Sequence, residues 1–188
     1  MQRAPYVEEL TRRVGREPDH FNQIEAEGGP SIGFIGFDHY PRKGHFTYFS
    51  HGLHLMLKPE WVAGRPEYFI TIDNPNREFA LFFAYLLSAF APEKIMGWNT
   101  LIGAGEEDAV KGHPYRRIAL GPPAYLDWDS YRIEEPNELP INLGMAYFIS
   151  DEDFEKAAAT GFGYLEQKMQ DDPDYWRKIK KRSRFRFF

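Results

Sequence analysis

The chain has 188 residues, of which 43% are hydrophobic and 16% aromatic, so it can bury a core as one domain. It contains no cysteine, which excludes disulfides and thiolate metal sites. All 28 Asp and Glu but only sixteen of the 23 Lys and Arg precede Arg177, so residues 1–176 carry −12 and the last twelve residues carry +7. Such an acidic body repels nucleic acid and attracts basic partners.

The sequence predicts no membrane contact. Residues Met1–Leu10 lack the apolar stretch of a signal peptide. The longest apolar run, Phe79–Ala91, is shorter than the roughly 20 residues that span a bilayer. Because the absence of cysteine also fits a reducing compartment, we expect a cytoplasmic protein.

The N-terminal third predicts a helix and several strands. Apolar residues four apart indicate a helix over Tyr6–Val14, followed by a loop to Pro30. Strands are expected at Ser31–Phe37, after which 38–44 forms a turn, and over His45–Leu57, as one long strand or two linked strands with Gly52 as a possible bulge.

The middle of the chain predicts a strand and a central helix. Pro66 precedes a strand over Glu67–Asp73. Asn74 followed by Pro75 is typical of a helix start, and the helix runs to about Phe90. Its apolar residues cover most of its circumference, which favours a core helix over a ligand or membrane helix.

The second half predicts short strands, an acidic loop and a last helix. Strands are expected within 94–102, 115–120 and 125–128, and 131–138 forms an acidic loop. Ile141–Ile149 reads as a buried strand. Ser150 followed by Asp153 resembles a capping box that starts a helix to about Met169.

These elements predict a single α+β domain with a mixed, mostly antiparallel sheet packed by two or three helices. We divide the chain into an N-terminal helix and loop (1–30), the main domain (31–170) and a basic aromatic tail (171–188). The order of elements lacks the strict alternation of a dinucleotide-binding fold.

Three stretches together resemble the suppressor-of-fused domain family. TYFSHGLH, Thr47–His54, is similar to the strand region that reads T-x-G-L-S in the family, although His51 to His54 departs from it. The helix Phe79–Phe90 leads through Trp98 to Gly121-Pro122-Pro123. PINLGMAYFISDEDFEKAAATGFGYLEQKM, Pro140–Met169, is similar to the closing strand, turn and helix with an internal glycine, here Gly161.

The resemblance implies a protein-binding domain without a catalytic residue set or cofactor. Animal members hold a transcription factor by clasping an extended peptide, and many bacterial members look like immunity proteins that neutralise a toxin. The length of the chain matches one such domain and favours the bacterial kind. We therefore expect a protein partner, such as a basic toxin domain.

A carboxylate or histidine hydrolase is the alternative. Acids for such a site could come from residues 127–138, but glycosidase chemistry needs two carboxyl groups at a set separation of about 5–9.5 Å, which sequence cannot establish. His51 and His54 lie three apart, so they could share a metal only in a turn or helix, with His39 and His45 nearby. Surface or hydrogen-bonded histidines are the simpler interpretation.

The predicted partner-binding surface is the acidic aromatic stretch after Gly121-Pro122-Pro123. Its acids would steer a basic partner and its aromatic rings would supply contact area, whereas the plainer interpretation is a solvated loop. The residues assigned to it are Asp127, Trp128, Asp129, Tyr131, Glu134 and Glu135.

The tail interleaves seven cations with five aromatic residues from Tyr175 to Phe188. We expect it to fold onto the acidic body, because its aromatic rings gain by burial. A solubilising end, or a nucleic-acid contact through stacking and charge, is the alternative.

Overall fold

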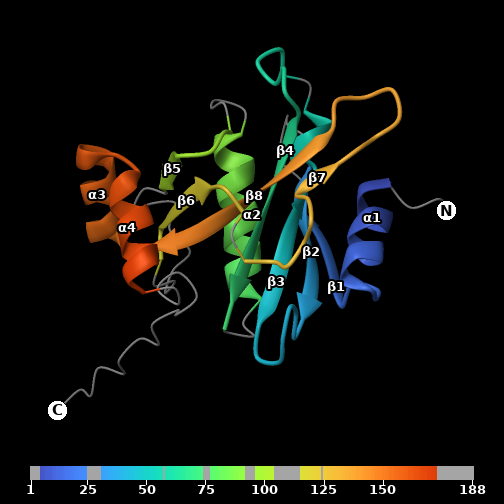
Figure 1. Cartoon of the computed structure of the whole chain (residues 1–188), viewed down its shortest axis with the longest axis horizontal. Coiled ribbons are helices and arrows are strands. Elements are labelled where there is room, and N and C mark those ends of the chain that lie inside the picture. Colours follow the sequence, from blue (N-terminus) through green and yellow to red (C-terminus); the bar gives the residue numbers. More distant parts are fainter. Residues whose placement is uncertain are drawn as a thin grey trace.

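The computed structural model describes residues 5–24, 31–56, 58–73, 77–91, 96–103, 115–123 and 125–172. Eight strands form one open sheet: β1 (His20–Ile24), β2 (Ile32–Asp38), β3 (Phe46–His51), β4 (Arg65–Ile72), β5 (Thr100–Gly103), β6 (Arg117–Gly121), β7 (Arg132–Ile133) and β8 (Ile141–Ile149). Their order is β1-β2-β3-β4-β8-β6-β5, with β7 pairing β8 (Figure 1). Every pairing is antiparallel except that of β4 with β8. The predicted mixed, mostly antiparallel α+β sheet is confirmed.

The sheet carries a hydrophobic core on each face. Helix α2 (Glu78–Phe90) packs on one face (Figure 1). The opposite core takes side chains from α1 (Pro5–Val14), α3 (Asp151–Thr160) and α4 (Gly163–Asp171). Because side chains alternate along a strand, Ile32 and Phe34 of β2 join the α2 core, and Ile35 and Phe37 join the other. In the described part of the chain, no helix is long and apolar enough to cross a membrane.

Most predicted elements are confirmed, but β1 lies in a segment predicted as loop. Its described side chains, residues 20–23, are exposed or only partly buried, so no apolar alternation announces a strand. Backbone pairing with β2 creates the strand instead, in the register His20 to Gly36 through Ile24 to Ile32.

The prediction of strand throughout His45–Leu57 is wrong after His51. Gly52 adopts φ 118° and precedes a short 3₁₀ helix, η1 (Leu53–Leu55). A side chain at Gly52 would place its Cβ 2.4 Å from the carbonyl oxygen of Ser31, so both the backbone angle and the close approach require glycine.

Three smaller predictions are also corrected. Residues 125–128 form a bend followed by irregular backbone rather than a strand, and the short strand β7 lies inside the predicted acidic loop. The predicted C-terminal helix starts at the expected cap, where the Ser150 hydroxyl accepts the Asp153 N–H, but it breaks at Gly161, whose φ is 94°. The break makes four α-helices among the described residues instead of three. The predicted Asn74–Pro75 helix start and the tail from residue 173 lie outside the described residues.

A buried polar cluster ties α1, β3, η1 and β4 together. Glu67 of β4 is fully buried, and its carboxylate accepts hydrogen bonds from the Ser50 hydroxyl and the Gly52 N–H. It also accepts the His54 N–H at 3.0 Å and the ring Nδ1–H of His54 at 2.6 Å. The Tyr6 hydroxyl of α1 donates to the Ser50 carbonyl oxygen at 3.0 Å. The cluster therefore fixes both the turn after β3 and the position of α1.

Replacing Glu67 by Gln tests this cluster. One carboxylate oxygen becomes an NH₂ group that faces donors, so buried N–H groups lose their acceptor. We expect the free energy of unfolding in urea to fall by about 3 kcal/mol. The control Glu166→Gln changes an exposed acid of α4 and should alter it by less than about 0.5 kcal/mol. Equal effects of the two substitutions would contradict the role of Glu67.

His51 lies beside this cluster and should make stability depend on pH. Burial lowers the pKa of His51 below its ordinary 6.5, against the opposing attraction of Glu67. As the pH falls from 6.5 toward the lower pKa of the folded state, the unfolded chain binds more protons than the folded chain. The free energy of unfolding therefore falls across that pH window. His51→Gln should reduce the loss of unfolding free energy between about pH 7 and 5, as measured by urea unfolding. An unchanged slope would show that His51 does not cause it.

Candidate functional site

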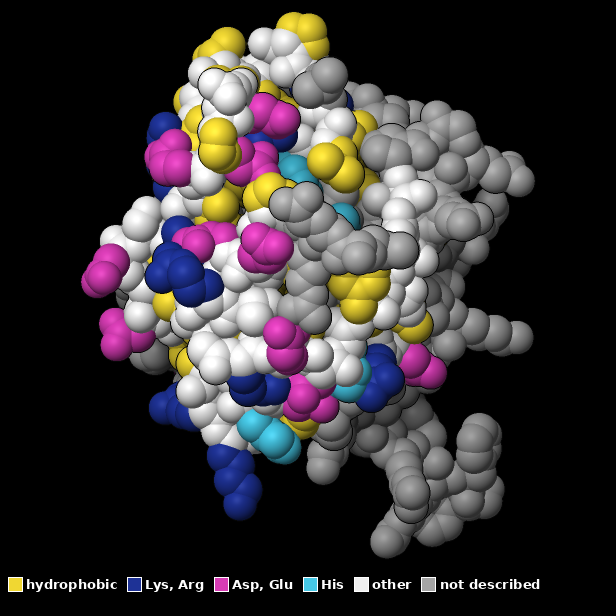
Figure 2. All heavy atoms as spheres, turned by 90° about the vertical axis from the view of Figure 1, so that its right-hand side faces the viewer, with side chains coloured by type: hydrophobic (Ala, Val, Ile, Leu, Met, Phe, Trp, Pro, Cys, Tyr) yellow, Lys and Arg dark blue, Asp and Glu magenta, His cyan; other side chains and the backbone are white. Residues whose placement is uncertain are grey.

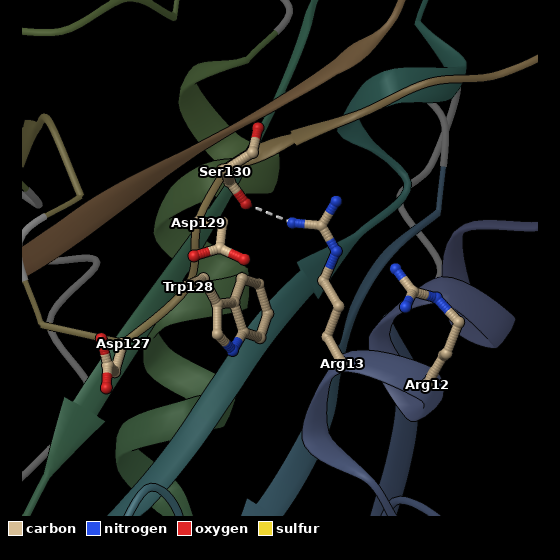
Figure 3. Close-up of a pocket in the computed structure, with 6 residues that line it drawn as sticks. All are labelled: Arg12, Arg13, Asp127, Trp128, Asp129 and Ser130. Carbon is tan, nitrogen blue, oxygen red and sulfur yellow. Dashed lines mark hydrogen bonds between the residues drawn. The ribbon is translucent and has the colours of Figure 1, made fainter.

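A groove of about 310 Å³ lies between the last turn of α1 and the bend after β6 (Figure 3). Asp127, Trp128, Asp129 and Ser130 form one wall, and Arg12 and Arg13 form the other. The structure thus brings the first half of the predicted partner-binding stretch next to α1, more than a hundred residues earlier in the chain.

Arg13 holds the two walls together. Its guanidinium donates to the carbonyl oxygens of Ser130 and Arg132, the latter at 2.7 Å. It lies 5.2 Å from the centre of the Trp128 ring and donates to Glu9 at 2.6 Å. Because one planar cation contacts both the backbone and the ring of the bend, it fixes the bend against α1.

Arg12 offers an exposed cation at the groove. Its side chain is 71% exposed and forms an ion pair with Glu9 at 2.6 Å. Hydrogen bonds from Arg12, with a further contribution from Arg13, lower the pKa of Glu9 to about 2. Glu9 therefore stays ionised at neutral pH and holds both arginines in place.

Trp128 is a rigid aromatic wall of the groove. Its ring stacks on Phe49 at 5.6 Å and 3°, and its indole N–H donates to the Tyr40 hydroxyl at 2.7 Å. Tyr131, also predicted to contact a partner, stacks on Phe69 and donates to the carbonyl oxygen of Leu126, outside the groove lining. Both rings are partly buried, so they support the bend as well as presenting surface.

Asp127 and Asp129 are exposed, and within the described residues neither has a hydrogen bond or ion pair. The groove therefore presents free carboxylates opposite arginines. This local mixture of charges differs from the mainly acidic surface, with five acids and one Arg, that the sequence predicts for residues 127–138.

Glu134 and Glu135 lie away from the groove lining. Glu134 forms an ion pair with Arg132, and its side chain is 72% exposed. Glu135 binds the buried Arg65 of β4, whose guanidinium also binds Glu138 and donates to the Leu139 carbonyl oxygen at 2.9 Å. Glu135 therefore serves to attach the acidic loop to the sheet.

The histidines are brought together only in part. The turn at Gly52 places the His51 and His54 rings 5.6 Å apart, edge to face. His39 instead contacts Phe46, and His45 contacts Tyr125. Across the described ranges, no three His, Cys, Asp or Glu side chains gather in a way that could hold a metal ion.

Arg12 and Arg13 are groove residues that the sequence does not predict. Their positions in the last turn of an amphipathic helix are readable from the sequence as favourable to the helix dipole. Their second role depends on where α1 packs, which is a long-range contact that no local pattern encodes.

Comparison with known proteins finds similarity in fold alone. No family model matches the sequence, and no curated protein matches it. The structure of the Sufu–Fu complex matches with a TM-score of 0.59 at 17% identity, over 88% of this chain and 83% of that one.

Two further structures are similar. Drosophila Suppressor of Fused matches with a TM-score of 0.60 at 15% identity over 88% of this chain, which spans 46% of the Drosophila chain. A suppressor-of-fused homologue from Neisseria gonorrhoeae FA 1090 matches with a TM-score of 0.64 at 14% identity, over 95% of this chain and 94% of that one. The chain therefore has a suppressor-of-fused-like fold.

Proposed function

We propose that this chain is a protein-binding domain without catalytic activity, and that the groove beside α1 contacts the partner. The observation that carries the proposal is the fixed Trp128 ring flanked by the exposed carboxylates of Asp127 and Asp129. The similarity in fold to Sufu, which was crystallised in a complex with Fu, supports it.

The groove has features of a protein contact. Aromatic rings with restricted motion lose little entropy on binding, and they are frequent among residues that dominate binding energy. Exposed charges of both signs favour a partner that presents complementary charges and disfavour others. Asp127 and Asp129 can meet cations of the partner, and Arg12 can meet one of its acids.

A carboxylate hydrolase has less support. Such an enzyme needs two acids facing a substrate cavity. Glu135 and Glu138 instead bind one guanidinium, that of Arg65. Asp127 and Asp129 lie on an exposed bend beside a shallow groove rather than in an enclosed pocket.

The proposed biological role is that of a bacterial immunity-type protein which binds and neutralises a toxin. The match to the Neisseria homologue, over 95% of this chain and 94% of that one, supports the bacterial kind. The charge of −12 on residues 1–176 suits a basic toxin domain, since opposite charges raise the association rate. The proposed partner is therefore basic overall.

Charge reversal tests the contact. We expect purification from the native cell to recover one partner protein with the chain. Asp127→Lys/Asp129→Lys should weaken binding of that partner at least tenfold in calorimetry, because two attractive contacts become repulsive. Glu135 is left unchanged, since its loss would leave Arg65 without one of its buried partners.

The matched control is Glu155→Lys/Glu166→Lys, which makes the same change in net charge at exposed positions of α3 and α4. It should weaken binding less than threefold, through general electrostatics alone. Equal losses in both variants would mean that net charge, and not the groove, governs binding. No loss in either would overturn the assignment of the groove.

A further inference from the structure

A second groove, here called the apolar groove, lies at the end of the molecule where η1 leads into β4. Its volume is about 250 Å³, and it is lined by Met56, Lys58, Pro59, Trp61, Arg65 and Leu139. Leu139 is 44% exposed, and the neighbouring Leu55 and Val62 are 59% and 80% exposed. Figure 2 shows hydrophobic side chains gathered at the top of the face it draws, over this end of the molecule.

Single exposed aliphatic side chains are common on protein surfaces, but a group around a groove is typical of an interaction site. Here Leu55 and Val62 come from the segment between β3 and β4, and Leu139 comes from the loop before β8. The two segments are fixed to one another, because Arg65 donates to the Leu139 carbonyl oxygen and binds Glu138. The apolar groove is therefore built by sequence-distant residues on a rigid base.

Trp61 supplies an independent sign of a missing ligand. It lines the apolar groove and is only 6% exposed, yet its indole N–H, which is closed off from solvent, has no hydrogen-bond partner among the described residues. Buried indole N–H groups almost always find an acceptor, because leaving one unsatisfied costs stability. A segment that shifts the Trp61 ring on entering the groove could bring a peptide carbonyl group to that N–H.

Among the described residues around the apolar groove, the carboxylates of Glu60, Glu135 and Glu138 outnumber the cations of Lys58 and Arg65. Its own cations are already bound: Arg65 by Glu135 and Glu138, and Lys58 by the Ala91 carbonyl oxygen. Glu60 is exposed, and the Glu138 side chain is 58% exposed. A segment with Lys or Arg beside its apolar side chain would meet these carboxylates, whereas an acidic segment would be repelled.

We propose that the apolar groove binds a short segment of the partner protein in which a large aliphatic or aromatic side chain is flanked by Lys or Arg. This inference rests on the proposed function and adds a second contact to it. The apolar side chain fills the groove beside Leu139, a carbonyl group of the segment accepts the Trp61 N–H, and the flanking cations meet Glu60 and Glu138. The chain stretch 127–139 thus contributes to both grooves.

Three synthetic peptides, KKGLFGKK, EEGLFGEE and KKGSNGKK, test the proposal with the intact chain. In ¹H–¹⁵N spectra, KKGLFGKK should shift the Trp61 indole signal, which Trp61→Phe identifies by its loss. KKGLFGKK should bind at least fivefold more tightly than either of the other two peptides. Leu139→Asp should reduce the affinity for KKGLFGKK at least tenfold. Leu81→Asp, at a similarly exposed leucine of α2, should change it less than twofold.

Any of the following results would overturn the proposal: equal binding of the Lys-flanked and Glu-flanked apolar peptides, no effect of Leu139→Asp, or self-association that Leu139→Asp abolishes. The last would assign the apolar groove to a second copy of the chain. A partner that loses affinity with Asp127→Lys/Asp129→Lys but binds Leu139→Asp unchanged would also overturn it while leaving the proposed function intact.

Discussion

Glu67 is a fully buried carboxylate in the middle of the sheet, and its hydrogen bonds decide how the chain turns between β3 and β4. A carboxyl group at such a position is stable only when hydrogen-bonding groups surround it, and here a hydroxyl, two backbone N–H groups and an imidazole do so. The same cluster receives Tyr6 through Ser50, so it also sets where α1 packs. Both grooves depend on it, because α1 forms a wall of one and the chain after η1 forms the other.

The proposed partner-binding surface follows from this arrangement. Once α1 is anchored by Tyr6, its last turn places Arg13 over Trp128, and Arg13 fixes the bend from residue 127 to 130. On the other side of the acidic loop, Arg65 binds Glu135 and Glu138 and so holds Leu139 beside Trp61. Two buried or partly buried arginines therefore convert an acidic loop into a surface of defined shape. The carboxylates that remain exposed, such as Asp127 and Asp129, are the ones available to a partner.

The sequence predicts those parts of the fold that local patterns encode. The strands β2, β4 and β8 and the helix α2 are apolar enough to be recognised, since each is buried by packing on the sheet. The strand β1 could not be recognised, because its polar side chains are compatible with a loop and only its pairing with β2 makes it a strand. The resemblance carried by Pro140–Met169 led to the fold that the structural comparisons support. The composition places Asp127 and Trp128 in the predicted partner-binding stretch, whereas the positions of Arg12, Arg13 and the apolar groove arise from contacts between distant segments.

The proposed function requires that a partner protein binds the surface around residues 127–130. Hydrogen–deuterium exchange on the chain alone and in complex with its co-purified partner tests it most directly. We expect slower amide exchange in the last turn of α1 and in residues 127–132 when the partner is bound. Protection confined to α3 and α4, with unchanged exchange beside Trp128, would contradict it.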